Sequence, residues 1–470
     1  MPLEREEMLG AMMASDASYN GRFITGVLTT GIYCLPSCRA RKPKAENVRF
    51  FANGVEAEAF GLRPCKKCKP DEFERGEDRE LDRLEELVGR VREEPSAYSG
   101  IGDLASALEV GPTKLSELFR RHYQTSPGEL LTAARVQAAK KRLLETESAV
   151  AEVAFDVGFE TLSTFNDNFK RRTGVTPTDY RRLPVARSAT LQLPSGYNVG
   201  TMLGYLGRDT NSVCERVEGR VATLAFRTPS GAGAVWLEFS AEAVALKVLS
   251  GNAGEVFETA SRVIGLDQDP RGFEQQAAQA GFGALIAGQP GARIPQTPSL
   301  FDGLLWAVIG QQINLAFAYK LRRRLVEAYG EPVGDGMYAT PTAERLAEAE
   351  IDDMLAMQFS RRKAEYIVGI ARLGEAWFEA LTHLSATRIE QKLLGVTGLG
   401  PWSVNYLMMR SLGYADCVPY GDTGLQAGLR KLHVLEGKID REQTDRLLAP
   451  FSPYRSLATY HLWQSLKETA

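Results

Sequence analysis

Four of the six cysteines in this 470-residue chain lie in two closely spaced pairs. Cys34 and Cys38 stand in "TTGIYCLPSCRARKPK", and Cys65 and Cys68 follow in "RPCKKC". Two short loops that each carry a pair of thiolates can enclose one ion, so the spacing predicts a tetrahedral zinc site with four cysteine ligands. Spacing alone leaves two functions open, a purely structural zinc site and one whose thiolate also reacts.

The residues around these thiols are strongly basic, although the whole chain has a formal net charge of only −3. Between Arg39 and Lys69 there are nine Lys or Arg residues against three Glu, which gives a local charge of +6 (9 − 3). A region of this charge attracts a phosphate backbone, so nucleic acid is its expected partner.

The sequence around the thiols, "TTGIYCLPSCRARKPKAENVRFF" and "AEAFGLRPCKKCKPD", resembles the amino-terminal domain of Ada-type methyl-phosphotriester sensors over most of residues 10 to 71. The resemblance implies that Cys34 accepts a methyl group from a methylated DNA phosphate while all four cysteines, Cys34, Cys38, Cys65 and Cys68, hold one Zn²⁺. A zinc-bound thiolate stays deprotonated at neutral pH, which makes this role chemically reasonable.

The resemblance also implies which residues meet the phosphate. Arg41 and Arg63 match family positions near it, and the alternative for both is a surface residue that only keeps the domain soluble. Leu35 stands where an arginine is common in the family, and Leu28 replaces another basic residue. Both differences are expected to weaken the grip on phosphate.

Periodicity divides the chain into four regions and predicts a multidomain α+β fold. Residues 1–75 form a small four-cysteine zinc domain, and residues 78–184 an all-α domain. Residues 188–264 alternate in short runs that predict a small antiparallel β-sheet domain, and residues 265–470 are again all-α. The segment "YRRLPVARS" is expected to be a linker.

The first helical region contains a repeated pattern. "IGDLASALEVGPTKLSELFRRHYQTSPGELL" predicts a helix, a turn at Gly111 and a second helix, and "AVAEVAFDVGFETLSTFNDNFKRRTGVTPTDYRR" repeats it about fifty residues later. The pair resembles an AraC-type tandem helix-turn-helix domain over residues 80 to 182, in which Pro112–His122 and Leu162–Arg171 would enter the major groove. The candidates for base contact, each with a solvated helix face as its alternative, are Thr113, Lys114, Ser116, Ser163, Asn166 and Lys170.

The second helical region carries a turn that can bind DNA. In "LLGVTGLGPWSVNYLMMRSLGYADCVPYGDTGLQAGLRK", Gly398 and Gly400 open a helix whose free backbone amides can bind a phosphate, and Asp422 follows 22 residues after Gly400. This arrangement resembles the helix-hairpin-helix DNA glycosylases. Residues from about 190 to 466 resemble the AlkA-type DNA-3-methyladenine glycosylases, with "AVIGQQI", "VEAYGE" and "SPYRSLATYHLW" as further matches.

The glycosylase resemblance implies hydrolysis of the N-glycosidic bond of alkylated purines such as 3-methyladenine and 7-methylguanine. An alkylated purine leaves readily, so one carboxylate suffices, and Asp422 would stabilise the developing sugar cation or orient the attacking water. From local sequence alone, Asp422 could equally be the cap of the helix "TGLQAGLRKL". Trp402 stands where relatives with lyase activity have a lysine, which favours hydrolysis by water over a Schiff base.

A base must leave the duplex to reach such a carboxylate, and aromatic side chains commonly receive it. Trp402, Tyr406 and Trp463 match the family's pocket positions, although ordinary aromatic core is the commoner use of such residues. Gln311 matches a further pocket position, and its alternative is a polar group at a helix end.

The loop "GQQIN" matches the family segment that fills the gap left by the flipped base. Gln312 stands where an apolar wedge is expected, and Ile313 lies beside it. The family also implies a monovalent cation at the hairpin, held by the carbonyls of Leu394, Val396 and Leu399.

The start of the chain, "MPLEREEMLGAMM", has neither the apolar run of a signal peptide nor that of a membrane anchor. We therefore expect a cytoplasmic, nucleoid-associated bacterial protein without disulfide bonds, in which Cys214 and Cys417 are core residues. The Pro-Cys-His-Arg site of the methyltransferase domain that often follows the sensor is absent from the sequence. The expected partners are double-stranded and alkylated DNA, with RNA polymerase as a further partner, and we expect a monomer.

These regions predict one polypeptide that joins an alkylation sensor and transcription regulator to a base-excision glycosylase. The alternative is a DNA-binding regulator whose glycosylase half is inactive.

Overall fold

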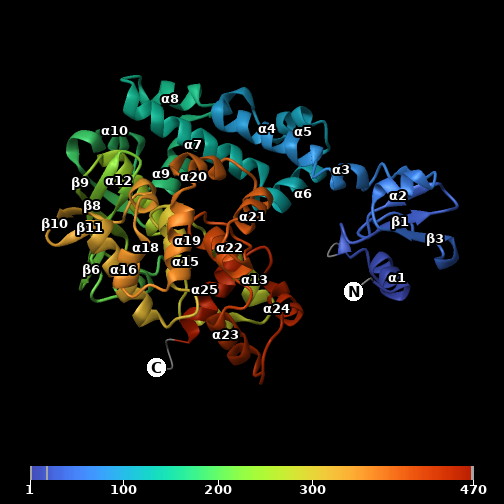
Figure 1. The fold of residues 1–470 in the computed structure, drawn as a ribbon. Coiled ribbons are helices and arrows are strands. Elements are labelled where there is room, and N and C mark those ends of the chain that lie inside the picture. Colours follow the sequence, from blue (N-terminus) through green and yellow to red (C-terminus); the bar gives the residue numbers. More distant parts are fainter. Residues whose placement is uncertain (1–2, 17–18, 467–470) are drawn as a thin grey trace. The chain divides into compact units, whose positions relative to one another are not determined.

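The computed structural model describes residues 3–16 and 19–466, and the chain divides into a small unit that ends at Glu86 and a large one that begins at Leu87. Figure 1 labels many of the elements of both units. The predicted multidomain α+β fold is confirmed, since the four-cysteine cluster, the helical regions and the small antiparallel sheets all form. No helix in the described ranges is long and apolar enough to cross a bilayer.

The small unit is built on a four-stranded sheet in the order β3-β1-β2-β4. Strand β1 pairs antiparallel with β2 and β3, whereas β4 runs parallel to β2. Ile24, Tyr33 and Phe51 belong to its core and are at most 8% exposed. The elements are α1 (Arg5–Ala14), β1 (Ile24–Val27), β2 (Ile32–Cys34), β3 (Val48–Phe51), α2 (Gly54–Ala59), β4 (Arg63–Pro64) and α3 (Pro70–Glu74).

The helical region that follows contains the expected tandem helix-turn-helix units. In the first unit the predicted turn residue Gly111 has an ordinary φ of −75° and is the N-cap of α6. Glu109 adopts the left-handed conformation instead, with φ 60°. The helices are α4 (Arg79–Glu93), α5 (Ile101–Leu108), α6 (Pro112–Tyr123), α7 (Pro127–Glu145), α8 (Val150–Asp156), α9 (Leu162–Thr173) and α10 (Pro177–Ala186).

A five-stranded antiparallel sheet in the order β5-β9-β8-β7-β6 comes next, as predicted. The prediction that "YRRLPVARS" is a linker is wrong, because α10 continues to Ala186 and β5 begins at Ser188. Leu183 in this segment is 0% exposed, so apolar packing holds the segment in place. The elements are β5 (Ser188–Gln192), α11 (Val199–Leu206), β6 (Glu215–Glu218), β7 (Val221–Thr228), β8 (Gly231–Phe239), β9 (Ala243–Ser250) and α12 (Ala253–Val263).

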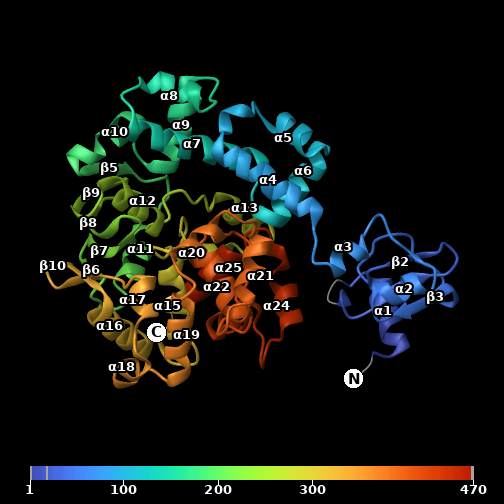
Figure 2. The ribbon, with the colours of Figure 1, turned by 45° about the horizontal axis from the view of Figure 1, so that its top comes forward.

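The second helix-turn-helix unit and this sheet share one apolar core. Rings from α9, α10 and α12 meet edge to face, with centroids 5.4 Å apart for Phe169 and Tyr180 and 5.6 Å apart for Tyr180 and Phe257. Glu258 of α12 accepts hydrogen bonds from Tyr180 Oη (2.7 Å) and Lys140 Nζ (2.7 Å). Figure 2 shows α10 beside β5 and α12, so these regions form one packed body.

The rest of the chain forms the predicted helical region around a second apolar core. Helix α15 contacts α16, α19 and α22 and is buried on nearly all sides. Helices α21 and α22 enclose the turn Gly395–Gly400 and form the helix-hairpin-helix. The elements are α13 (Arg271–Gln279), α14 (Gly283–Ala287), α15 (Leu300–Ile309), α16 (Leu315–Tyr329), β10 (Glu331–Gly334), β11 (Met337–Ala339), α17 (Ala343–Ala347), α18 (Ile351–Ala356), α19 (Arg361–Ala371), α20 (Glu375–Thr382), α21 (Ala386–Leu394), α22 (Pro401–Arg410), α23 (Thr423–His433), α24 (Arg441–Leu448) and α25 (Arg455–Ser465).

Candidate functional site

The four clustered cysteines converge in the small unit, where their sulfur atoms all lie within 4.8 Å of one another. The pairing of β2 with β4 brings the two thiol pairs together, because β2 ends at Cys34 and the backbone N–H of Cys65, just after β4, donates to the Tyr33 carbonyl (3.0 Å). Four enclosed sulfur donors at this spacing are the ligand set of a tetrahedral Zn²⁺. The predicted zinc site is therefore confirmed at the level of its ligands.

The thiols differ in their hydrogen bonds. The backbone N–H of Leu35 donates to Cys68 Sγ (3.4 Å). Among the described contacts, Cys34 receives no such backbone donor. An N–H bond stabilises a thiolate and reduces its nucleophilicity.

Two of the predicted phosphate contacts, Arg41 and Arg63, are exposed. The two departures from the family differ in position, since Leu28 is 45% exposed whereas Leu35 is 5% exposed and belongs to the core of the small unit. Some basic side chains near the thiols serve the fold, because Lys42 Nζ donates to the carbonyls of Met12 and Cys38.

The expected reading helices are α6 and α9, and their side chains differ in exposure. Lys170 and Ser163 are exposed, whereas Lys114, Ser116 and Asn166 are half-buried. Ser116 Oγ also donates to the carbonyl of Pro112 (2.9 Å), which ties it to its own helix.

Sequence reasoning missed Glu117 and Arg120 on α6. Together with the predicted Thr113, they are exposed at helical spacing and form one solvent-facing stripe. The apolar residues Leu115, Leu118 and Phe119 mark the buried face of α6, and the sequence could have placed the exposed stripe on the opposite face.

Asp422 is held by three donors at the start of α23. Its Oδ1 accepts from Trp463 Nε1 (2.8 Å) and from the backbone N–H of Leu425 (2.7 Å). Its Oδ2 accepts from Trp402 Nε1 (2.9 Å). The carboxylate therefore caps its helix, as one of the two interpretations from sequence predicted, and it is also clamped between two indoles.

Close packing of three helices makes this arrangement possible. Trp402 comes from α22, Trp463 from α25, and Asp422 is the N-cap of α23. A Cβ on Gly424 would lie 3.0 Å from Trp463 Cδ1 and 3.2 Å from Asp422 Oδ1. The absence of a side chain at this position lets the indole reach the carboxylate.

The predicted aromatic residues gather beside Asp422. Trp402 and Tyr406 stack with centroids 5.4 Å apart and planes at 22°, and Tyr406 lies 6.3 Å from Trp463. Burial raises the pKa of Tyr406 to about 12, so its hydroxyl is neutral at physiological pH. These three rings can present flat faces to a base.

The conformation of the hairpin depends on Gly398 and on hydrogen bonds from Gln311. Gly398 has φ 96°, and a Cβ there would lie 2.5 Å from the ring of Tyr366. Gln311 Nε2 donates to the Gly398 carbonyl (2.9 Å) and to Ser403 Oγ (3.2 Å). The predicted pocket residue Gln311 thus has its amide hydrogens engaged by the hairpin and the helix after it.

The predicted wedge loop lies between α15 and α16. Gln312 is exposed with φ 55° at the tip of the turn, whereas Ile313 packs partly against the core. Leu315, the first residue of α16, is 62% exposed, and sequence reasoning did not single it out. The sequence signal that could have identified Leu315 was an apolar residue at the start of a helix, close to the tip of the predicted wedge loop.

Cys214 and Cys417 are buried, as predicted for core residues, at 1% and 2% exposed. Burial raises the pKa of both thiols to about 12, so neither is reactive at neutral pH.

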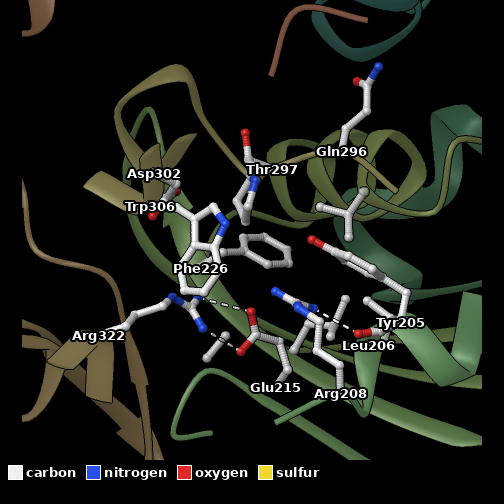
Figure 3. A pocket seen from close by; sticks show the side chains of 14 residues that line it. Tyr205, Leu206, Arg208, Glu215, Phe226, Gln296, Thr297, Asp302, Trp306 and Arg322 are labelled. Atoms are coloured by element: carbon white, nitrogen blue, oxygen red, sulfur yellow. Dashed lines mark hydrogen bonds and ion pairs between the residues drawn. The ribbon is translucent and has the colours of Figure 1, made fainter. Parts of the chain in front are cut away.

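A cavity of about 50 Å³ lies between the sheet and α15–α16 (Figure 3), and two residues that line it, Tyr205 and Trp306, also interact with Tyr406. Arg322 makes a two-pronged ion pair with Glu215 at 2.8 and 2.9 Å, and Arg208 lies 3.8 Å from the ring centroid of Tyr205. Burial opposes ionisation of Glu215, but Arg322 prevails and lowers its pKa to about 2. The cavity has room for water molecules.

The fold and these contacts define a helix-hairpin-helix DNA glycosylase that shares its chain with a zinc-binding and a helix-turn-helix domain. Family models agree: "Metal binding domain of Ada" matches residues 7–71, "Helix-turn-helix domain" matches residues 104–183, and "HhH-GPD superfamily base excision DNA repair protein" matches residues 305–453.

A relative from Mycobacterium tuberculosis, named probable bifunctional transcriptional activator/DNA repair enzyme AlkA, is 31% identical over 98% of this chain and 96% of its own length. A Bacillus subtilis protein named DNA-3-methyladenine glycosylase is 29% identical over 59% of this chain and 96% of its own. The solved 3-methyladenine DNA-glycosylase of Archaeoglobus fulgidus, 22% identical, has the same fold over 60% of this chain and 99% of its own (TM-score 0.55). This chain belongs to the family of bifunctional Ada/AlkA transcriptional activators and DNA repair enzymes.

Proposed function

We propose that the chain acts in the adaptive response to DNA alkylation, as a DNA glycosylase that hydrolyses the N-glycosidic bond of alkylated purines and as a sensor that regulates transcription. The observation that carries the glycosylase half is the Asp422 carboxylate, clamped by Trp402 and Trp463 next to a DNA-binding hairpin.

In the proposed reaction, a flipped purine stacks on the aromatic faces beside Asp422. As the base leaves, positive charge develops on the sugar, and the fixed carboxylate stabilises it or orients the incoming water. The two indole N–H groups hold the carboxylate in place before the reaction, so little reorganisation is needed. The position of a lyase's lysine is occupied by Trp402, whose N–H is bonded to Asp422, which supports water as the nucleophile.

Base release from a methylated duplex tests this half. The full chain should release free 3-methyladenine or 7-methylguanine and leave the strand intact until alkali is added. The matched control is Asp422→Asn, because asparagine is also a good N-cap and preserves the helix. No release by the wild-type chain above that of Asp422→Asn would support the alternative in which this half only binds DNA. A strand break before alkali would contradict hydrolysis by water.

For the sensor half we propose that the Cys34 thiolate attacks the methyl carbon of a methyl phosphotriester. An S–CH₃ bond forms as the C–O bond breaks, and the phosphodiester leaves as an anion. Zinc bound by the four cysteines keeps the thiolate deprotonated. A four-thiolate zinc site has a formal charge of about −2, and one thioether reduces it to about −1, which weakens repulsion from DNA.

Mass spectrometry after incubation with methyl-phosphotriester DNA tests the sensor. One methyl group should appear on the peptide that contains Cys34, and the Cys34→Ser chain should remain unmodified. A methyl group on Cys68, the half-exposed thiol, would contradict the assignment of Cys34. We further propose that the regulator acts with RNA polymerase and is associated with the nucleoid. We also propose that the chain is a monomer, which light scattering of the purified chain tests.

A further inference from the structure

The last two residues of α6, the first of the two helices expected to read DNA, are buried rather than exposed to solvent. His122 and Tyr123, in the last turn of α6, are each 5% exposed. His122 faces the glycosylase region of the same unit, where α6 contacts α21, the first helix of the helix-hairpin-helix. His122 Nδ1 lies 2.9 Å from Thr387 Oγ1 at the start of α21. The helix-turn-helix domain is thus bonded to the helix that leads into the DNA-binding hairpin.

Gln124 makes the second contact, with the segment that leads to Asp422. It follows α6 in the left-handed conformation (φ 52°), and its Oε1 accepts the backbone N–H of Asp416 (2.7 Å). Its Nε2 lies 4.0 Å from Cys417 Sγ. A side chain of the helix-turn-helix domain therefore satisfies a backbone donor six residues before Asp422.

The remaining contacts of this segment come from the glycosylase itself. The Asp416 carboxylate is paired with Arg455 at 2.7 and 2.8 Å, and the Cys417 N–H donates to Ser456 Oγ (3.0 Å). Both partners are at the start of α25, which also carries Trp463. Gln124 contributes the bond that these partners leave open, because a backbone N–H that is removed from water needs an acceptor.

These contacts leave the stripe of α6 formed by Thr113, Glu117 and Arg120 exposed. The last turn of α6 therefore contacts the glycosylase region, while the stripe that would read DNA remains accessible on the exposed side of the same helix.

We propose that the end of α6 is a positioning element of the glycosylase. Gln124 fixes the segment Asp416–Asp422 that carries the reactive carboxylate, and His122 fixes the start of α21 and through it the hairpin. This assignment rests on the proposed glycosylase function.

Single-turnover base release from methylated duplex by the full chain tests the proposal. Gln124→Met keeps the size of the side chain and removes the acceptor. With saturating enzyme its rate constant should fall about fivefold, the effect of losing one such hydrogen bond, while the concentration for half-saturation is unchanged. Gln124→Glu retains an acceptor oxygen and should recover most of the rate.

The matched control is Gln391→Met, since Gln391 is exposed on α21 and has no side-chain bond among the described contacts. A loss of folded protein would lower the active fraction but not the rate constant at saturating enzyme. Equal rate constants for Gln124→Met and Gln391→Met would overturn the proposal.

Hydrogen exchange separates this proposal from the proposed function. Gln124→Met should speed exchange in the peptide that covers residues 412–424, and Gln391→Met should not, whether or not the chain releases bases. Wild-type chain that releases no base would refute the proposed function alone. Unchanged exchange in that peptide would refute the role of Gln124.

Discussion

The clamp on Asp422 predicts a defined loss of rate when one indole N–H is removed. In Trp402→Phe the ring that stacks on Tyr406 remains, but the bond to Oδ2 (2.9 Å) is lost. Asp422 keeps two donors, Trp463 Nε1 at 2.8 Å and the Leu425 N–H at 2.7 Å. A hydrogen bond to a charged group contributes about 1.5–3 kcal/mol, and water can replace part of it because Trp402 is half-buried. We therefore expect a loss of about 1–2 kcal/mol.

That loss corresponds to a rate about 5- to 30-fold lower in single-turnover release of 7-methylguanine. Trp377→Phe is the control, because Trp377 lies on α20 and packs against Phe378 rather than Asp422. Its rate should equal that of wild type. A Trp402→Phe rate within twofold of the control would mean that the indole bond does not position the carboxylate, and the clamp would then be no more than packing.

Three further predictions follow from particular contacts. Gly398→Ala should weaken binding of undamaged duplex about tenfold or more, because the added Cβ meets the Tyr366 ring at 2.5 Å and φ 96° is strained for alanine; fluorescence anisotropy measures it, and unchanged affinity would contradict it. Burial lowers the pKa of His461 to about 4, so the unfolded chain binds a proton first and the free energy of unfolding should fall as the pH drops from about 6.5 to 4; urea titrations measure this, and His461→Gln should flatten it. Removal of zinc by a chelator should abolish methyl transfer and lower the melting temperature of the small unit, while base release persists; loss of base release would show that the units depend on each other.

Much of the site could be predicted because its residues lie in short motifs. Within each cysteine pair and between the two hairpin glycines only a few residues of backbone intervene, so the spacing carries the local geometry. Gln311 shows the limit of such matching. Its position was predicted, but that its amide braces the Gly398 carbonyl depends on how α15 packs against the hairpin 87 residues away.

The linker prediction failed for a related reason. "YRRLPVARS" contains a proline and several arginines, which are common in solvated segments, and this composition outweighed the apolar residue Leu183. In the structure that residue is fully buried in the core that the second helix-turn-helix unit shares with the sheet. Burial of one side chain against a distant element cannot be read from the composition of the segment that carries it.

The amino-acid sequence by itself determined the chemistry that the chain carries, namely four thiolates for zinc, two helix-turn-helix units, and one carboxylate after a glycine hairpin. Each of these appears in the sequence as short motifs of neighbouring residues, even where two motifs must come together in the fold. Only the tertiary structure decided that indoles from α22 and α25 close on Asp422 and that Gln124 reaches Asp416, 292 residues further on. Those contacts depend on which helix faces pack together, and that choice is made by the burial of whole apolar surfaces rather than by any local motif.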